Sequence, residues 1–313
     1  MNDPTAKNAD ALFDRDEPQR TDNLCAEASY VRALRSRPQL WRTILAVAVG
    51  LGALLLVLFV VIVPAGTALD RLLGVDPFDP ADPTVTVGFW LAGNLLLAAL
   101  VPVSGLAQWA IYRERPRWLS SVAGRFRWLV MARAAVVVAP IWIAYTVVLH
   151  LLMPFGAPQF TAAAIMLMIV AIVVVPLQSA GEEYLFRGLL FRAVGARFQR
   201  PGVGLAVATV VTSLAFGAVH GSLDGWALSY YVLAGVCFAL MTQRTGGLEA
   251  AVLVHAVNNT VLMVSMILTD RLSDMAVVTG PVLVVPMIVM GLATVGLWKL
   301  APTLLKPVSA VTP

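Results

Sequence analysis

Three short motifs place acidic, basic and amide side chains inside long apolar stretches, where ionisable groups are costly and commonly functional. The motifs read EEYLFR from residue 182, FGAVH from residue 216 and HAVNN from residue 255. They supply these candidate site residues: Glu182, Glu183, Arg187, Phe216, His220, His255 and Asn259. Residues four apart share a helical face, so Phe216 should lie over His220, and His255 over Asn259. A carboxylate, two imidazoles and an amide in a bilayer could activate a water for peptide hydrolysis, bind a metal ion, relay protons in a transporter, or form a structural polar core.

The two adjacent acids of the first motif have different expected environments. Glu183 precedes Arg187 by four residues, which is the favourable order for an ion pair on one helical face. Glu182 is rotated by ~100° from Glu183, because a helix completes a turn in about 3.6 residues. We therefore expect that the two acids do not point at one spot and that Glu182 carries the free carboxylate.

Three further ionisable residues in apolar stretches have structural explanations. Arg133 stands near one end of its helix, where its long side chain can reach the interface. His150 stands near the opposite end of the same helix, where interfacial solvation is available. Glu249 is expected to open a helix, where an acid complements the N-terminal dipole.

The composition indicates a membrane protein. Of 313 residues, 59% are hydrophobic and 13% charged, against roughly 45–50% and 25% in soluble domains. A transmembrane helix needs ~20 apolar residues, and apolar stretches of about this length lie at residues 41–63, 87–112, 127–153, 161–186, 203–220, 226–243, 248–268 and 275–299. The expected fold class is all-α, a polytopic membrane helix bundle of about eight transmembrane helices. A soluble enzyme, a secreted domain and a disulfide scaffold are excluded.

The sequence divides into a long apolar region and two polar ends. Residues 1–40 are expected to form a largely disordered cytoplasmic tail, with a short helix near residues 26–35. Residues 41–300 are expected to form the membrane-embedded domain, with the motifs at residues 179–260, and residues 301–313 a cytoplasmic tail. The two cysteines, Cys25 and Cys237, provide no metal-binding pair.

Positive charge alternates between successive connections, which predicts orientation by the positive-inside rule. The connections and ends assigned to the cytoplasm contain Arg32, Arg35, Arg37, Arg42, Arg113, Arg115, Arg117, Arg125, Arg127, Arg192, Arg197, Arg200, Arg244, Lys299 and Lys306. The intervening connections contain only Arg71 and Arg271. Both termini are therefore expected to be cytoplasmic, in what we interpret as a bacterial plasma membrane.

Taken together and in this order, EExxxR, FxxxH and HxxxN resemble the CAAX prenyl endopeptidase and bacteriocin-processing family of intramembrane proteases, also called Abi. The resemblance covers residues 179–260 and implies an endopeptidase with its site in a membrane-embedded chamber. It favours hydrolysis over transport, although catalytically inactive scaffolds of the same family are an alternative. Other protease designs fit poorly: there is no HExxH zinc motif, and no aspartate is expected deep in a helix for a two-aspartate site.

The resemblance also implies roles and partners. Glu182 would act as general base for a water that His220 holds or shares, while His255 and Asn259 donate to the developing oxyanion. Glu183, Arg187 and Phe216 would give structural support. A metal-free mechanism is preferred, with zinc on Glu182, His220 and His255 as the alternative. The expected partners are the lipid bilayer and a membrane-associated peptide or protein substrate, not nucleic acid.

If the helices were straight and began at the same level, the three motifs would lie at different depths in the membrane. His220 lies about 25 Å along its helix from Val203, whereas His255 lies only ~10 Å from the cytoplasmic end, at 1.5 Å per residue. Either the fifth helix begins well out in the cytosol, or the fourth tilts or kinks strongly at Pro176.

Overall fold

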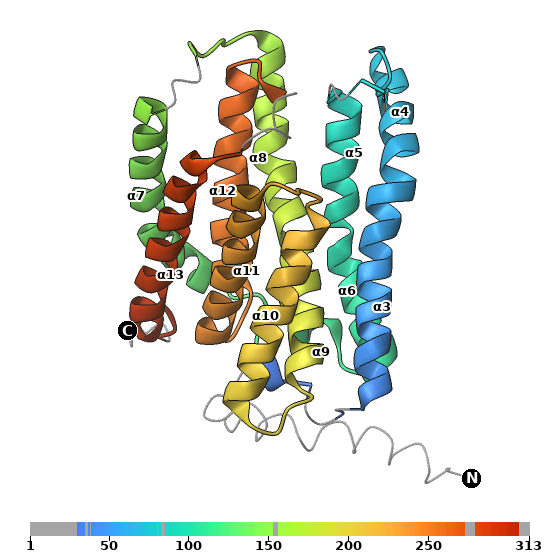
Figure 1. Cartoon of the computed structure of the whole chain (residues 1–313), viewed down its shortest axis with the longest axis vertical. Helices are drawn as coiled ribbons and strands as arrows, with labels where there is room; N and C mark the ends of the chain where they lie inside the picture. Colours follow the sequence, from blue (N-terminus) through green and yellow to red (C-terminus); the bar gives the residue numbers. More distant parts are fainter. Residues whose placement is uncertain are drawn as a thin grey trace, which may run out of the picture.

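The computed structural model describes residues 30–34, 37, 39–79, 81–82, 85–152, 156–272 and 279–306, and every long element within these ranges is a helix (Figure 1). The helices are η1 (Tyr30–Arg32), α3 (Leu40–Leu56), η2 (Val57–Val61), α4 (Ile62–Leu73), α5 (Val87–Ala98), α6 (Leu100–Tyr112), η3 (Pro116–Leu119), α7 (Trp128–Leu152), α8 (Ala162–Glu183), η4 (Tyr184–Leu190), α9 (Phe191–Gly195), α10 (Pro201–Val219), α11 (Gly225–Thr245), α12 (Glu249–Leu268), η6 (Pro281–Leu283) and α13 (Val284–Leu304). Within the described ranges they provide eight spans long and apolar enough to cross a membrane, which confirms the expected fold class.

The first span is longer than predicted. It was expected to end at residue 63, but α3, η2 and α4 run on through Pro64 to Leu73. The π-helical turn η2 comes just before Pro64 and includes Val60, whose carbonyl would meet the proline ring in a regular α-helix. Proline is tolerated there because the wider turn relieves that clash.

An aspartate inside this span corrects a second expectation. Asp70, which comes after the predicted end of the first span at residue 63, is fully buried near the end of α4. It accepts hydrogen bonds from Thr86 Oγ1 at 2.6 Å and from the backbone N–H groups of Gly88 and Phe78 at 2.7 and 3.1 Å. Asp70 therefore ties the connection after α4 to the start of α5.

The fourth span also exceeds its predicted length, because α8, η4 and α9 continue to residue 195 instead of ending at 186. Arg192, expected in a cytoplasmic connection, is instead buried in α9. Its Nη1 donates to Gln108 Oε1 at 2.7 Å, and its guanidinium lies 5.2 Å from the ring centre of Tyr30. Tyr30 donates to the Leu119 carbonyl, so η1 packs against the base of the bundle.

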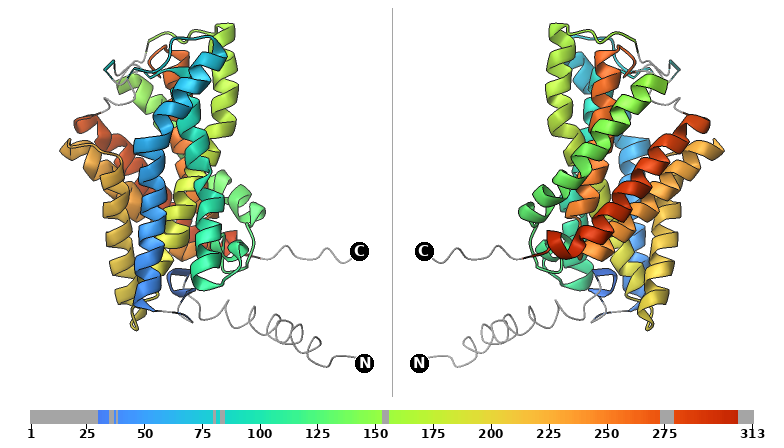
Figure 2. Two further views of the ribbon diagram at one scale, coloured as in Figure 1. Left: turned by 90° about the vertical axis from the view of Figure 1, so that its right-hand side faces the viewer. Right: turned by 90° about the vertical axis from the view of Figure 1, so that its left-hand side faces the viewer.

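The relative heights of the helices resolve the depth problem. In Figures 1 and 2, α10 begins below the lower ends of α11 and α12, and the turn between α10 and α11 lies about half-way up the bundle. The end of α10 thereby lies beside the middle of α12 and well below its upper end. The first alternative, a fifth helix that begins further out, describes the structure better than a kink in the fourth.

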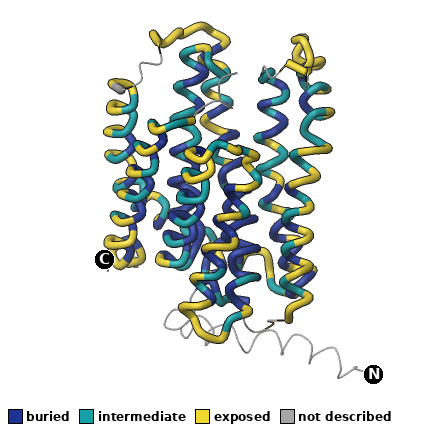
Figure 3. Tube along the Cα trace, in the orientation of Figure 1, coloured by how far each residue is buried: buried dark blue, intermediate teal, exposed yellow. Residues whose placement is uncertain are grey.

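Buried positions concentrate in the centre and lower half of the bundle, where α8, η4, α11 and α12 meet (Figure 3). The outer faces of α3 and α7 are exposed, as expected for helices that face lipid; Ile44 and Val136 are examples. Residue 25 and most of the predicted polar tails, residues 1–29 and 307–313, lie outside the described residues, so the predictions for them stay predictions.

Candidate active site

The candidate residues come from elements that pack together in the buried centre. Glu182 and Glu183 end α8, Arg187 lies in η4, and His255 and Asn259 lie in the lower part of α12, which packs along α8. The π-helical geometry of η4 begins directly after the two acids. Such turns are rare and frequently mark functional sites.

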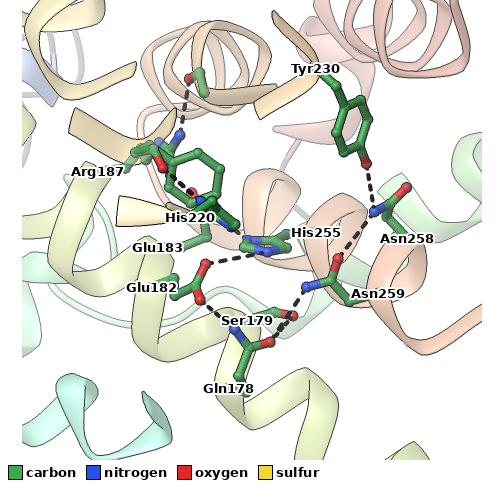
Figure 4. A network of polar contacts seen from close by, with 12 residues as sticks. Gln178, Ser179, Glu182, Glu183, Arg187, His220, Tyr230, His255, Asn258 and Asn259 are labelled. Atoms are coloured by element: carbon green, nitrogen blue, oxygen red, sulfur yellow. Dashed lines mark hydrogen bonds and ion pairs between the residues drawn. The ribbon is translucent and has the colours of Figure 1, made fainter. Parts of the chain in front are cut away.

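His255 lies between the two adjacent acids (Figure 4). Its Nδ1 is 2.8 Å from Glu183 Oε1, and its Nε2 is 3.6 Å from Glu182 Oε2. The expectation that the acids cannot point at one spot is therefore wrong. Side chains ~100° apart on one helix still reach opposite nitrogens of an imidazole inserted between them. Because an ionised carboxylate only accepts hydrogen bonds, Glu183 keeps the proton of His255 on Nδ1.

Arg187 is fully buried and forms the expected ion pair. Its Nη1 donates to Glu183 Oε1 at 3.0 Å, and its Nη2 donates to the Gly235 carbonyl at 3.1 Å. The guanidinium also lies over aromatic faces, at 4.5 Å from the ring centre of Phe216 and 5.1 Å from that of Phe238. Cation–π contacts of this kind are strongest where water is excluded. The cation is thus held by one carboxylate, one carbonyl and aromatic rings.

Phe216 connects the two histidines. Its ring centre is 4.7 Å from that of His220 and 5.9 Å from that of His255, both edge-on. His255 also stacks on Phe238 at 4.8 Å. The packing of both imidazoles on one buried ring explains why an aromatic residue precedes His220 by one helical turn.

Glu182 has a partner that the sequence analysis did not identify. Gln178, one turn earlier in α8, donates its Nε2 to Glu182 Oε1 at 2.5 Å. The other oxygen, Oε2, accepts no hydrogen bond from the part of the chain that the structure describes, and it faces His255. Glu182 therefore has one fixed oxygen and one available oxygen.

Side-chain amides form a hydrogen-bonded chain that runs from Gln178 through Asn259 to Asn258. Asn259 Nδ2 is 3.4 Å from Gln178 Oε1, and Asn258 Nδ2 donates to Asn259 Oδ1 at 3.1 Å and to Tyr230 Oη at 2.9 Å. The pair NN in the third motif hinted at Asn258. Tyr230 carried no such signal, since its contact joins separate helices.

His220 ends α10 and is more exposed than the other site residues. Its Nδ1 is 2.7 Å from the Phe216 carbonyl, and its ring stacks on Tyr231 at 3.8 Å. Because a carbonyl only accepts, Nδ1 must carry a proton, which leaves Nε2 as the acceptor in the neutral ring. The structure brings His220 to the site through Phe216, whereas the imidazole paired with Glu182 is that of His255.

Glu249, Arg133 and His150 have surroundings that agree with the structural explanations given for them. Glu249 opens α12 and is paired with Arg127 at 2.7 Å. Arg133 donates to the carbonyls of Leu304 and Lys306, at the end of α13, where cations are favoured. His150 is exposed near the end of α7.

The donor set does not have the arrangement of a zinc site. Among the described residues, no three or more His, Cys, Asp or Glu side chains come together in a group that could hold a metal ion. Glu182, His220 and His255 therefore do not form a ready ligand set in this arrangement.

Comparisons with known proteins agree with the motifs. Residues 161–261, which contain all seven candidate residues, match the family model described as type II CAAX prenyl endopeptidase Rce1-like. A relative from Bacillus subtilis (strain 168), the uncharacterized protein YyaK, is 26% identical over 262 residues, or 78% of this chain and 83% of the relative. No solved structure matches the chain. With its eight apolar spans and this family match, the chain is an integral membrane protein whose residues 161–261 resemble the Rce1-like type II CAAX prenyl endopeptidases, which confirms the resemblance inferred from the motifs.

Proposed function

We propose that the protein is an intramembrane endopeptidase that hydrolyses a membrane-associated peptide or protein with an activated water. The observation that carries the proposal is the position of His255 between Glu182 and Glu183, with Asn259 one turn further along α12. This arrangement supplies a carboxylate oxygen free to take a proton, beside donors with fixed orientation.

In the proposed reaction, Glu182 Oε2 removes a proton from a water that His220 Nε2 helps to hold. The hydroxide attacks the scissile carbonyl carbon, and a C–O bond forms. The side-chain amide of Asn259 and a protonated His255 Nε2 donate to the developing oxyanion. The C–N bond then breaks, and Glu182 returns its proton to the leaving amine. Glu183 orients His255, and Arg187 and Phe216 hold that pair in place.

The proposed location is a bacterial plasma membrane with both termini in the cytoplasm. The alternation of arginine between connections supports it. The start of α3 and the end of α13 also lie toward the same end of the bundle (Figure 1). Protein prenylation is not expected in bacteria, so the proposed substrate is a membrane peptide or protein without a prenylated CAAX tail.

The test compares membrane peptides from cells that carry the wild type, Glu182→Gln or Glu249→Gln. Glu249→Gln is the matched control, because it makes the same change at a buried glutamate of α12 that pairs with Arg127 outside the site. We expect a set of peptides released by the wild type and the control but not by Glu182→Gln. Release that is unchanged in a folded Glu182→Gln variant would contradict the assignment. Loss of pH-dependent transport with no peptide released would favour the transporter alternative instead.

We also propose that the reaction needs no tightly bound metal. Metal analysis of the purified wild type, with His220→Ala and His255→Ala beside it, tests this. We expect less than stoichiometric zinc in all three proteins. Near-stoichiometric zinc in the wild type that is lost in both variants would overturn the preference.

A further inference from the structure

Gln178 has contacts on both sides of the candidate site. It is buried in α8, and its amide touches Glu182 through Nε2 and Asn259 through Oε1, at 2.5 and 3.4 Å. Its Oε1 also accepts from Ser179 Oγ at 3.2 Å. No other described side chain is hydrogen-bonded to both the proposed base and the proposed oxyanion donor (Figure 4).

The orientation of this amide follows from the chemistry of its neighbours. An ionised carboxylate accepts and cannot donate, so Gln178 must present its NH₂ group to Glu182. Its carbonyl oxygen then faces Asn259, which must present its own NH₂ group in turn. The carbonyl oxygen of Asn259 is thereby turned to Asn258, from which it accepts at 3.1 Å. The carboxylate of Glu182 thus sets the orientation of each amide in the chain.

This orientation has a consequence for Asn259. A primary amide has two N–H groups, and Gln178 Oε1 engages one of them. The second N–H is left to donate to substrate, and a flipped amide would instead present a carbonyl oxygen that repels an oxyanion. At the other end, the N–H of Gln178 fixes Glu182 Oε1 and leaves Oε2 to face His255.

We infer that Gln178 is a positioning residue that couples the general base Glu182 to the oxyanion donor Asn259. The inference rests on the proposed function. It assigns Gln178 no contact with the reacting atoms: its amide aims the free oxygen of Glu182 and keeps the donor face of Asn259 turned to the substrate. Replacing a residue that hydrogen-bonds a metal ligand typically costs ~10–100-fold in activity. By analogy, we expect a loss of the same size when a residue that orients a catalytic group by hydrogen bonds is replaced.

The kinetic test uses Gln178→Met, which has a similar length and cannot make these hydrogen bonds. The probe is a synthetic peptide spanning the strongest wild-type-dependent cleavage found in the membrane-peptide comparison. The control is Thr212→Val, because Thr212 is buried in α10 and its hydroxyl donates to the Ala208 carbonyl of its own helix. We expect kcat to fall ~10–100-fold in Gln178→Met with KM within about twofold, and no such fall in the control. A kcat within about twofold of the wild type would overturn the inference.

A double-mutant cycle on thermal unfolding separates this inference from the proposed function, since it needs no activity. Gln178→Met is measured in the wild type and in a Glu182→Leu background. We expect the substitution to lower the unfolding temperature less when Glu182 is absent, because the unmet hydrogen bond is then gone. Equal losses in both backgrounds would refute the coupling. Coupling without any wild-type cleavage would instead sink the proposed function, and with it the catalytic consequence assigned to Gln178.

Discussion

At the scale of single residues, Glu183 Oε1 is the atom on which most of the site depends. It accepts from Arg187 Nη1 at 3.0 Å and lies 2.8 Å from His255 Nδ1. The same carboxylate therefore neutralises a buried cation and sets the proton position of the imidazole. Its neighbour Glu182 instead accepts a hydrogen bond from the Gln178 amide, so the two adjacent acids have different partners and different proposed roles.

This division predicts different costs for removing the two acids. Glu183→Ala or Arg187→Ala leaves a buried charge without its partner, which costs ~3–5 kcal/mol of stability. The double variant Glu183→Ala/Arg187→Ala should recover part of that loss, but not activity, because His255 is no longer held. Glu182→Ala should lose activity at a smaller cost in stability, because it removes a desolvated carboxylate and breaks only the hydrogen bond from Gln178.

Thermal unfolding of the four purified variants in detergent checks this prediction. The assignment would be reversed if Glu182→Ala unfolded the protein while Glu183→Ala stayed folded and inactive.

At the scale of helices, a close approach of α8 to α5 determines where the two acids lie. A Cβ on Gly181, the residue before Glu182, would overlap the Leu97 carbonyl of α5. The small residue therefore allows the backbones to touch, as is common between membrane helices. Any larger side chain must push the end of α8 outward and carry Glu182 with it.

Gly181→Ala should accordingly destabilise the protein by about 1–3 kcal/mol, the usual cost of overpacking, and lower cleavage. Gly52→Ala on α3 is the matched control, because a Cβ there meets no atom within 4 Å. The measurement is the unfolding temperature of both variants together with the rate of peptide release. Equal behaviour of the two variants would show that the contact between α8 and α5 does not position the site.

The helices also show which features the sequence could predict. The eight spans follow from apolar length, and the Glu183–Arg187 pair follows from i,i+4 spacing within one helix. Contacts between helices have no such periodic signal, so the insertion of His255 between the acids was missed. Arg192 was misplaced because a charged residue after an apolar run indicates a loop, unless a partner such as Gln108 holds it inside.

At the scale of the whole molecule, the described ends of the bundle and the charge pattern agree. α3 begins and α13 ends toward the same end (Figure 1), and the connections expected on that side contain most of the arginines between the spans. We therefore expect reporter fusions at residue 10 and at the C-terminus both to report the cytoplasm. An external signal at either end would contradict the topology.

The height of the turn between α10 and α11 shows where the end of α10 lies in the bundle. The turn between α10 and α11, which begins at His220, lies about half-way up the molecule (Figures 1 and 2). His220 is more exposed than the buried Glu182 and His255.

The most direct test of water activation by Glu182 is isotope labelling in isolated membranes. Hydrolysis in ¹⁸O-labelled water places an oxygen from that water in the new carboxyl terminus, which is carried by the product from the N-terminal side of the cleaved bond. Mass spectrometry should find such labelled peptides with the wild type and with Glu249→Gln, but not with Glu182→Gln. Labelled peptides at wild-type levels from the Glu182→Gln membranes, or none above those from membranes lacking the protein, would contradict an intramembrane endopeptidase that uses Glu182 as its base.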